Sequence, residues 1–499
     1  MNSKEGVDSP VQEFYRGGCV FVTGSTGFVG KALVEKLLRA CPNIEKVYLL
    51  IRSKKGVSPD VRCKELLNNP VFDRLRESNV LQKIEAVAGD VSEPSLGLSS
   101  TDKANIIANV TVVFHSAATV KFNETLQEAV KLNTMGTQAV LELCKEMVKL
   151  RALIHVSTAY SNAHRKDVGE EVYEPPANPY GIVQCIENLS PQLVEELSNK
   201  LIAQNHPNTY TITKNMAESI VAQYGADFPI AIVRPSIVTG AWQEPFPGWV
   251  DNVSGITGIM MEIGRGTIRS IICDDKNLVD IIPVDIVVDS LIVAAWHTAN
   301  YRKSSVTVYN CTSGTLNPIR WHELGNFTLK HAKTTPSKYL QWYPGFTFTT
   351  NRFLHYLKDT FLHSMPAFLM DVVLQLQGSK PMHSLFGTEP NEYIIMDCKP
   401  SYLDLLNNKV LWSMMKICRR FRAAAKTGEF FALHEWIFNC DNQKALTNHM
   451  TAGDKSFFNP DVSKLNWDEY VKIYLLGIRK YVLKDTPETL EPARRKLKM

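Results

Sequence analysis

Short apolar runs alternate with helical stretches between residues 18 and about 240. The stretches repeat apolar residues at helical spacing, most clearly at Lys31–Ala40, Lys64–Glu77 and Glu124–Leu150. Strands that alternate with helices predict an α/β fold, a doubly wound parallel sheet of the Rossmann kind. The runs rich in β-branched residues that predict its strands are CVFVTG, VYLLIR, KIEAVAGDV, VTVVFHSAA, ALIHVSTAY and IAIVRPS.

Two segments depart from this alternation. Residues 161–208 form a long insertion before the helix near Tyr210, and it contains the helical stretch PQLVEELSNKLIAQ. We expect it above the carboxyl ends of the strands, where ligands bind in this fold class. The alternation fades after about residue 300, and the rest of the chain is predicted to be mainly helical. The expected organisation is a catalytic domain over 15–300 and a helical C-terminal domain over 320–490.

Composition and charge exclude several functions. The 499 residues are 44% hydrophobic and carry 55 basic against 51 acidic residues, so no nucleic-acid partner is expected. The ten cysteines lack metal-ligand spacing, so no metal is expected. The N-terminus has no secretory segment, and no apolar run is long enough to span a bilayer. Three interpretations stay open for FLHSMPAFLMDVVLQL (361–376): a buried helix pair, a substrate channel, or a helix that lies on a membrane.

The stretch TGSTGFVG joins the first predicted strand to an amphipathic helix. Gly24 allows the tight turn, Gly27 lets the backbone approach a pyrophosphate, and Gly30 lets the helix pack on the strand. The phosphates would lie at the N-terminus of that helix. The candidate cofactor-binding residues of this turn are Thr23, Gly24, Thr26, Gly27, Phe28 and Gly30.

The end of the second strand predicts which dinucleotide binds. Arg52, followed by Lys54, stands where an enzyme that prefers NAD usually has an acidic residue. A guanidinium can bind a ribose 2′-phosphate through two hydrogen bonds, so NADPH is expected. The alternative is that Arg52 and Lys54 belong to a solvated basic loop that binds no phosphate. The remaining candidates follow later strands: Asp90 and Val91 near the adenine, Ala117 and Ala118 near the adenosine, and Arg234, Pro235 and Ser236 near the carboxamide.

Tyr210 and Lys214 lie four residues apart in TYTITKNMAESI and therefore on one face of a helix. We expect Lys214 to lower the pKa of the Tyr210 phenol, which would donate a proton to a carbonyl oxygen that gains negative charge. Both residues also count as cofactor-binding, because Lys214 would hold the nicotinamide ribose. Thr158, or alternatively Ser157, would hydrogen-bond the same carbonyl. The Asn133 amide would hold a water that relays protons to Lys214, unless it is an ordinary packing asparagine.

In this order, TGxxGxxG, Asp90, Asn133, Thr158 and YxxxK resemble the extended short-chain dehydrogenase/reductases. The blocks FVTGSTGFVGKALVEKLLR, VYLLIRSKKG, HVSTAYSN, NTYTITKNMAE and IVRPSIVTG are similar to the catalytic domain of the fatty acyl-CoA reductase family. The blocks MPAFLMDVVLQLQGSKP and NWDEYVKIYLLGIRKYVLKD are similar to the C-terminal, sterility-type domain of that family. The resemblance covers about residues 15 to 490.

The resemblance implies an enzyme that reduces long-chain acyl-CoA to a primary alcohol with two NADPH, through a bound aldehyde, and releases CoA. Thr158 and Tyr210 would stabilise the oxyanion, and no cysteine would form a covalent intermediate. The insertion 161–208 and the aromatic C-terminal half are the expected walls of an acyl channel. The alternatives are a reductase of sterols or nucleotide sugars and a non-catalytic NADP(H)-binding sensor.

The resemblance also implies a location at the cytosolic face of an intracellular membrane, that of the peroxisome, the endoplasmic reticulum or a lipid droplet. Some members continue past the RKYVL block into a hydrophobic anchor, whereas this sequence ends at EPARRKLKM. Contact with a membrane is therefore expected rather than a span. No oligomeric state follows from these motifs.

Overall fold

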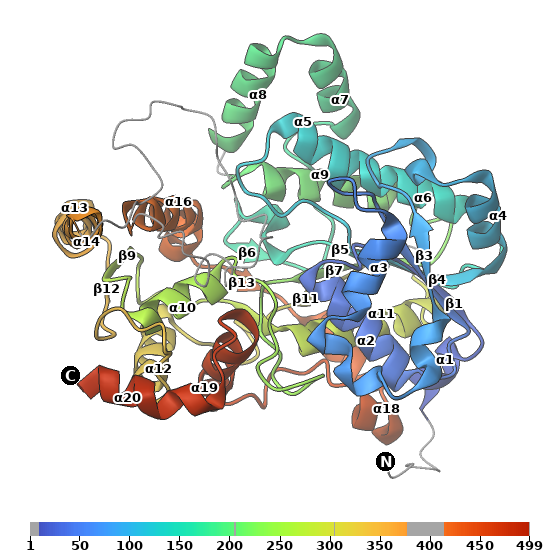
Figure 1. Cartoon of the computed structure of the whole chain (residues 1–499). Helices are drawn as coiled ribbons and strands as arrows, with labels where there is room; N and C mark the ends of the chain where they lie inside the picture. Colours follow the sequence, from blue (N-terminus) through green and yellow to red (C-terminus); the bar gives the residue numbers. More distant parts are fainter. Residues whose placement is uncertain (1–8, 204–205, 304, 377–413, 499) are drawn as a thin grey trace.

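A seven-stranded parallel sheet is the centre of the computed structural model, which describes residues 9–203, 206–303, 305–376 and 414–498 (Figure 1). The strand order β11-β7-β5-β4-β1-β2-β3 runs outward in both directions from β1, so the doubly wound fold is confirmed. The strands are β1 (Cys19–Thr23), β2 (Lys46–Ile51), β3 (Ile84–Ala88), β4 (Val110–His115), β5 (Ala152–Val156), β7 (Ile230–Pro235) and β11 (Thr307–Cys311).

Helices cover both faces of the sheet, which is why its central strands are continuously apolar. Successive residues of β1 point to opposite faces: Val20 and Val22 join one hydrophobic core, and Phe21 joins the other. The first core is shared with α2 (Phe28–Ala40) and α11 (Val284–Asn300). The second is shared with α4 (Ser100–Asn109), α6 (Gly136–Glu146) and α9 (Thr209–Gln223).

The six strands expected from the sequence are present, whereas two of the expected helices end elsewhere. The stretch 64–77 divides into α3 (Pro59–Leu67) and a 3₁₀ turn, η1 (Pro70–Leu75), because Pro70 disfavours helical backbone at Asn69. The stretch 124–150 consists of α5 (Leu126–Ala129), the π-helical turn η4 (Val130–Met135) and α6. The seventh strand, β11, lies past residue 300, where no strand was expected.

The insertion projects from the sheet as a pair of helices, α7 (Pro179–Asn188) and α8 (Pro191–Ala203), above α5 and α9 (Figure 1). Its apolar side chains form a small core with these helices, in which Ile182 and Leu201 meet Ile212 and Met216. The insertion therefore rests on the helix that carries Tyr210.

The C-terminal part is mainly helical, as expected, and it shares the larger core of the catalytic part. The Tyr470 hydroxyl lies 2.6 Å from the Thr239 hydroxyl and donates to the Gly240 carbonyl at 2.6 Å. A Cβ at Gly477 would lie 1.7 Å from the Gly248 carbonyl oxygen, so the two backbones touch. The boundaries 15–300 and 320–490 stay a prediction.

The helices of this part have the following bounds: α12 (Trp321–Thr334), α13 (Arg352–Asp359), the π-helical η6 (Thr360–Ser364), α14 (Met365–Leu376), α16 (Met414–Leu433), α17 (Asp441–His449), α18 (Ala452–Phe457), α19 (Trp467–Gly477) and α20 (Leu490–Lys498). Short parallel strand pairs join them to the catalytic part: β13 (Ile437–Phe438) with β6 (Asp167–Val168), and β12 (Thr347–Thr349) with β9 (Ser270–Ile272). A third pair, β8 (Ile237–Thr239) with β10 (Ile281–Pro283), forms a separate two-stranded sheet that begins just after β7 along the chain. The remaining helices are α1 (Pro10–Tyr15) and α10 (Ile256–Arg265).

Candidate active site

The glycine turn after β1 has the geometry that a phosphate site needs. Gly24 has a φ of +75°, and a Cβ there would lie 2.7 Å from the backbone nitrogen of Ala117, so only glycine fits. A Cβ at Gly30 would lie 2.2 Å from the Gly24 carbonyl oxygen. Gly27 caps α2 without a side-chain hydrogen bond, which leaves the first amides of the helix available to an anion.

The side chains of the turn support the same interpretation. The Ser25 hydroxyl is buried and has no hydrogen-bond partner among the described residues, so a ligand atom can satisfy it. Thr26 is half-buried in the turn. The Phe28 ring begins α2 and stacks on Trp249 with ring centres 5.1 Å apart, which fixes the start of the helix. The turn therefore fits the pyrophosphate of a dinucleotide.

A buried hydrogen-bonded chain holds this turn to β4 and α6. The Thr23 hydroxyl accepts from the Ala117 amide at 3.1 Å and lies 2.8 Å from His115 Nδ1. His115 Nε2 lies 3.0 Å from the Thr137 hydroxyl. Burial, and to a smaller degree the charge of Lys214, lowers the pKa of His115 to about 3, so this imidazole is neutral near pH 7.

The structure brings Arg52 and Asp90 together at the ends of β2 and β3. Arg52 Nη1 lies 3.3 Å from Asp90 Oδ2, and 47% of the arginine side chain is exposed. Burial raises the pKa of Asp90, but hydrogen bonds from Ser92 and the charge of Arg52 outweigh it, so the net pKa is below the usual value. Lys54 follows in the same loop. The guanidinium is thus accessible to a ligand from solvent.

The other candidates for the adenosine end lie nearby. Val91 is buried against Gly136, where a Cβ would lie 3.1 Å from the Val91 carbonyl oxygen, so α6 closely approaches this segment. Ala117 is half-buried and Ala118 is exposed in the loop after β4. Their small side chains leave room above the glycine turn.

Tyr210 lies in the first turn of α9, next to Thr158 at the end of β5. A hydrogen bond from the Thr158 hydroxyl reaches the half-buried phenol. Burial raises the pKa of Tyr210 to about 12, and this hydrogen bond offsets only part of the rise. The expectation that Lys214 lowers this pKa was therefore wrong. The phenol is protonated at neutral pH and is equipped to donate.

Lys214 is buried one turn further along α9. Its Nζ donates to the Val156 carbonyl at 2.7 Å and lies 3.3 Å from His155 Nε2. These contacts hold the ammonium against β5, which explains why it does not lower the pKa of Tyr210. Burial lowers the pKa of Lys214 to about 8, and the charge of Glu218 opposes the shift. Burial and the charge of Lys214 hold the pKa of His155 well below its usual value, so Lys214 has a neutral neighbour.

Asn133 lies in the π-helical turn η4 and is buried. Its Oδ1 accepts from the Thr119 amide at 2.8 Å, and its Nδ2 donates to the Thr119 carbonyl at 3.2 Å and the Thr213 hydroxyl at 3.0 Å. The amide is thus committed to protein partners, which corrects the expectation that it holds a relay water. Asn133 ties the loop after β4 to α9, the packing role that was kept as the alternative.

Arg234 also differs from the expectation. Its guanidinium forms a fully buried ion pair with Glu218 at 2.6 Å and donates to the carbonyls of Gly169 and Glu171. These donors are all taken up by protein partners, so its role is to hold α9 and the insertion to β7. No sequence motif pointed to Glu218, which lies eight residues after Tyr210 on the same face of α9.

The serine and proline candidates line the same edge of the sheet. The Ser157 hydroxyl is buried without a hydrogen-bond partner in the described part of the chain, so it stays available as the alternative to Thr158. Pro235 ends β7, and Ser236 is the buried residue that follows it.

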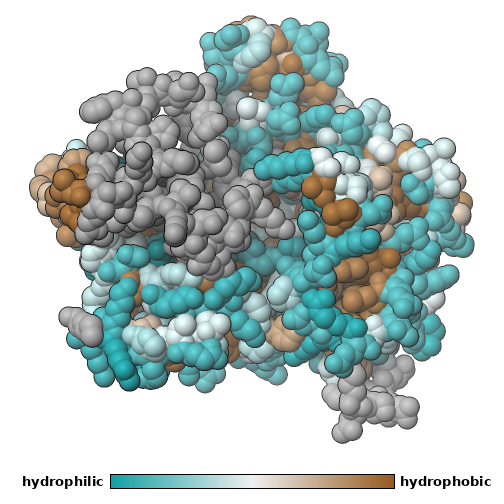
Figure 2. Space-filling model, viewed as in Figure 1, coloured by the Kyte–Doolittle hydropathy of each residue, from teal (hydrophilic) through white to brown (hydrophobic). Residues whose placement is uncertain are grey.

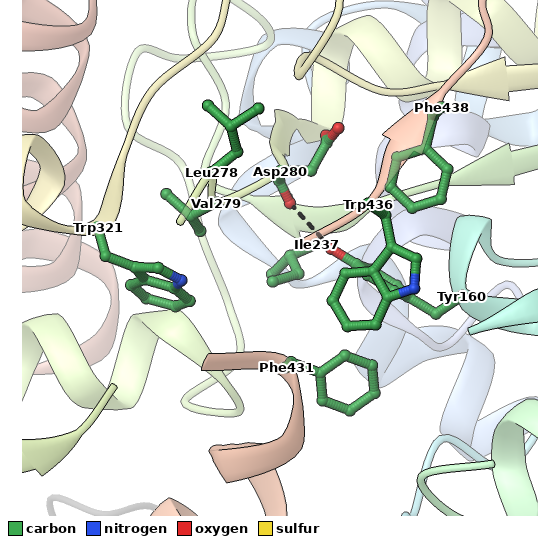
Figure 3. Close-up of a pocket in the computed structure, with 9 residues that line it drawn as sticks. All are labelled: Tyr160, Ile237, Leu278, Val279, Asp280, Trp321, Phe431, Trp436 and Phe438. Atoms are coloured by element: carbon green, nitrogen blue, oxygen red, sulfur yellow. Dashed lines mark hydrogen bonds between the residues drawn. The ribbon is translucent and has the colours of Figure 1, made fainter. Parts of the chain in front are cut away.

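An aromatic cleft lies beside this site (Figure 3). Counted together with the open solvent at its mouth, the cleft has a volume of about 270 Å³, and the Tyr160 hydroxyl donates to the Asp280 carbonyl at 3.5 Å across it. Aromatic side chains of the C-terminal half make much of the wall, as expected, whereas the insertion contributes none of the residues that Figure 3 labels. The aromatic residues of the wall are Tyr160, Trp321, Phe431, Trp436 and Phe438.

A row of aromatic rings in contact connects Tyr210 to this cleft. Phe122 stacks on Tyr210 with ring centres 5.9 Å apart and meets Phe431 at 5.5 Å. Phe431 packs edge-on against Tyr160 at 5.0 Å. Phe122, in the loop after β4, belongs to no motif and was not expected. Among the described residues, no group of His, Cys, Asp and Glu could hold a metal ion.

Comparisons with known proteins agree with this site. The family described as "Male sterility protein" matches residues 22–291, and a second model with the same description matches residues 393–485. Fatty acyl-CoA reductase 1 of Rattus norvegicus is 40% identical over 490 residues, which cover 98% of this chain and 89% of that protein. The chain belongs to the fatty acyl-CoA reductase family. Fatty acyl-CoA reductase 1 of Homo sapiens and fatty acyl-CoA reductase 2 of Mus musculus are 38% and 36% identical, with the same coverage.

This fatty acyl-CoA reductase is an oxidoreductase with a nicotinamide-binding domain. Two solved structures share its fold across both parts of the chain. The terminal R domain from the myxalamid PKS-NRPS biosynthetic pathway has a TM-score of 0.59 at 16% identity and covers 93% of this chain and 91% of its own. The reductase domain of a nonribosomal peptide synthetase from Mycobacterium tuberculosis has a TM-score of 0.57 at 16% identity and covers 95% and 96%.

The buried His115 predicts a pH dependence of folding. Its pKa is about 3 in the folded protein against 6.5 normally, so the unfolded chain binds more protons below pH 6.5 and stability falls as the pH falls. From pH 7.5 to 5.5, His115 should remove about 1.4 kcal/mol of the free energy of unfolding. Urea unfolding at both pH values should therefore show a smaller acid loss in His115→Asn than in the parent. Identical losses in the two proteins would contradict the assignment.

Proposed function

We propose that this fatty acyl-CoA reductase reduces long-chain acyl-CoA with NADPH, through a bound aldehyde, to a primary alcohol and free CoA. The observation that supports it best is the Thr158–Tyr210 pair, which lies at the carboxyl end of the sheet and next to an aromatic row. A nucleotide-sugar reductase would need polar contacts to the sugar hydroxyls, which this row of phenyl rings does not supply.

In this reaction the residues of the chain must stabilise and protonate a carbonyl oxygen. When bound, the nicotinamide would supply one hydride for each of the two reductions, so that two NADPH are used for each acyl-CoA. Thr158 and Tyr210 would donate hydrogen bonds to the thioester oxygen as it becomes an oxyanion, and Ser157 is the alternative donor. The hemithioacetal then collapses and CoA leaves as the thiol. The aldehyde needs the same donors again, and Tyr210, protonated at neutral pH, gives the alcohol its proton.

The cofactor residues divide between the two ends of the dinucleotide. The glycine turn with Ser25 would hold the pyrophosphate at the start of α2. Arg52, exposed beside Asp90, would bind the 2′-phosphate of NADPH through its fork of donors. Lys214 would hold the ribose near the nicotinamide, a role for which its buried ammonium lies on the same face of α9 as Tyr210.

The acyl chain would extend from Tyr210 along the aromatic row into the cleft. Phe122 and Phe431 present half-buried rings next to the phenol, and the cleft beyond them is lined mainly by apolar side chains. Apolar walls of this kind bind methylene groups through the hydrophobic effect. The free space that a water molecule could occupy in the cleft is only about 10 Å³, so its aromatic side chains would have to move apart to admit the chain.

A place at the cytosolic face of an intracellular membrane completes the proposal. The peroxisome, the endoplasmic reticulum and the lipid droplet are the membranes that the resemblance suggests. Both the acyl chain and the alcohol product partition into lipid, which supports such a location.

The activity predicts the effect of one hydroxyl. Tyr210→Phe removes a hydrogen-bond donor to the oxyanion, so release of free thiol from palmitoyl-CoA with NADPH should fall by at least about 100-fold. Tyr180→Phe, on the exposed helix α7, is the matched control and should keep the parent rate. Thiol release at the parent rate in Tyr210→Phe would refute its role. No thiol release by the parent with any acyl-CoA would refute the reaction.

The cofactor preference predicts a difference between NADPH and NADH. Arg52→Ser should raise KM for NADPH about tenfold, because a charge-assisted hydrogen bond is lost, and should leave KM for NADH unchanged. Arg16→Ser, an exposed arginine on the far side of β1, serves as the control. Equal use of NADH and NADPH by the parent would show that Arg52 does not select the cofactor.

The aromatic row predicts a chain-length effect. Phe431→Ala removes an apolar contact, so KM for palmitoyl-CoA should rise about tenfold while KM for butyryl-CoA changes less than twofold. Phe457→Ala truncates a half-buried phenylalanine on α18 and should alter neither. Equal changes for both substrates would place the acyl chain elsewhere.

A further inference from the structure

Large hydrophobic side chains are concentrated on the outer surface of α13, η6 and α14. Among the described residues, twenty large hydrophobic side chains are exposed, and ten of them lie between residues 353 and 376. Figure 2 shows this area in brown where Figure 1 draws α13 and α14. We call these ten side chains the apolar face; Phe353, Tyr356, Phe361, Leu369 and Leu376 are among them, with exposed fractions from 53% to 83%.

Three polar residues of the same helices, His355, Asp359 and His363, point inward. His355 Nδ1 lies 3.0 Å from the Ser270 hydroxyl, and His363 Nε2 accepts from the Arg269 amide at 2.7 Å, both next to β9. Asp359 pairs with Arg422 of α16 at 2.7 Å. A surface helix of a water-soluble protein normally does the opposite, with its apolar stripe toward the core. This stretch is therefore built for an apolar environment outside the protein.

The exposed charges beside the apolar face are positive. Lys426 is exposed on the neighbouring α16, and Arg352 is 71% exposed at the start of α13, where it pairs with Glu429, whose side chain is only 18% exposed. The acidic side chains of the stretch are withdrawn: Asp359 is 13% exposed within its ion pair, and Asp371 is buried. An apolar surface with exposed cations complements a membrane whose headgroups carry negative charge.

We propose that the apolar face docks this enzyme on an anionic lipid bilayer, with α13 and α14 lying in the interface. No helix in the described ranges is long and apolar enough to cross a membrane, which agrees with a helix that lies on the surface. Of the three interpretations of residues 361–376, exposure argues against the buried helix pair. The docking goes beyond the proposed reaction and does not depend on it, because vesicle binding needs no substrate.

Vesicle flotation of the full chain tests the docking. The parent should float with vesicles of phosphatidylcholine and phosphatidylserine, and less with phosphatidylcholine alone. The double variant F361Q/L369Q replaces two exposed apolar groups and should bind at least about tenfold more weakly. Because both positions are exposed, its thermal unfolding midpoint and its turnover of butyryl-CoA should match the parent.

The control V61Q/L193Q replaces two side chains of similar exposure on α3 and α8 and should bind vesicles like the parent. The proposal is overturned if the parent does not float, or if the control loses as much binding as F361Q/L369Q. It is equally overturned if F361Q/L369Q binds vesicles normally and instead dissociates a dimer in light scattering, since a second copy would then cover the face. None of these outcomes bears on thiol release, so the reaction is judged separately.

Discussion

The buried ion pair between Glu218 and Arg234 fixes the helix on which the chemistry depends. Tyr210, Lys214 and Glu218 follow one another at intervals of four residues on α9, so locking Glu218 also sets the rotation of the helix about its axis. Arg234 lies on β7 and also donates hydrogen bonds to the carbonyls of Gly169 and Glu171, so all three segments are fixed to Glu218 of α9. A fully buried pair gives little net stability, but the loss of one partner costs about 3–5 kcal/mol. The arrangement therefore enforces geometry more than it stabilises the fold.

Burial also sets the protonation states around this helix. The same desolvation that raises the pKa of Tyr210 to about 12 lowers the pKa of Lys214 to about 8. His115 and His155 are neutral because they are buried and because Lys214 is already a cation among them. Near pH 7 the phenol holds its proton and one ammonium is the local positive charge. Such a site favours an oxygen that becomes negative.

The features that depend on a local pattern of residues could be predicted from the sequence. Strand alternation, the glycine turn and the position of Tyr210 relative to Lys214 follow from spacing along the chain, and the structure contains them. The roles of Asn133 and Arg234 were wrong because their partners, Thr119 and Glu218, are identified only by tertiary packing. The exposure of residues 353–376 could not be predicted either. A helical repeat of apolar residues marks a face, and only the fold shows whether that face points inward.

Helix α16 joins the two functional surfaces. Arg422 pairs with Asp359 behind the apolar face, and nine residues later Phe431 meets Tyr160 and Phe122, the ring that stacks on Tyr210. At a rise of 1.5 Å per residue these positions are about 14 Å apart along the helix. If α13 and α14 lie on lipid, the end of α16 holds the aromatic row close to that surface. An acyl chain bound along the row would then need to move only a short distance out of the bilayer. The C-terminal part thus relates where the enzyme docks to what it reduces, while the sheet supplies the hydride site.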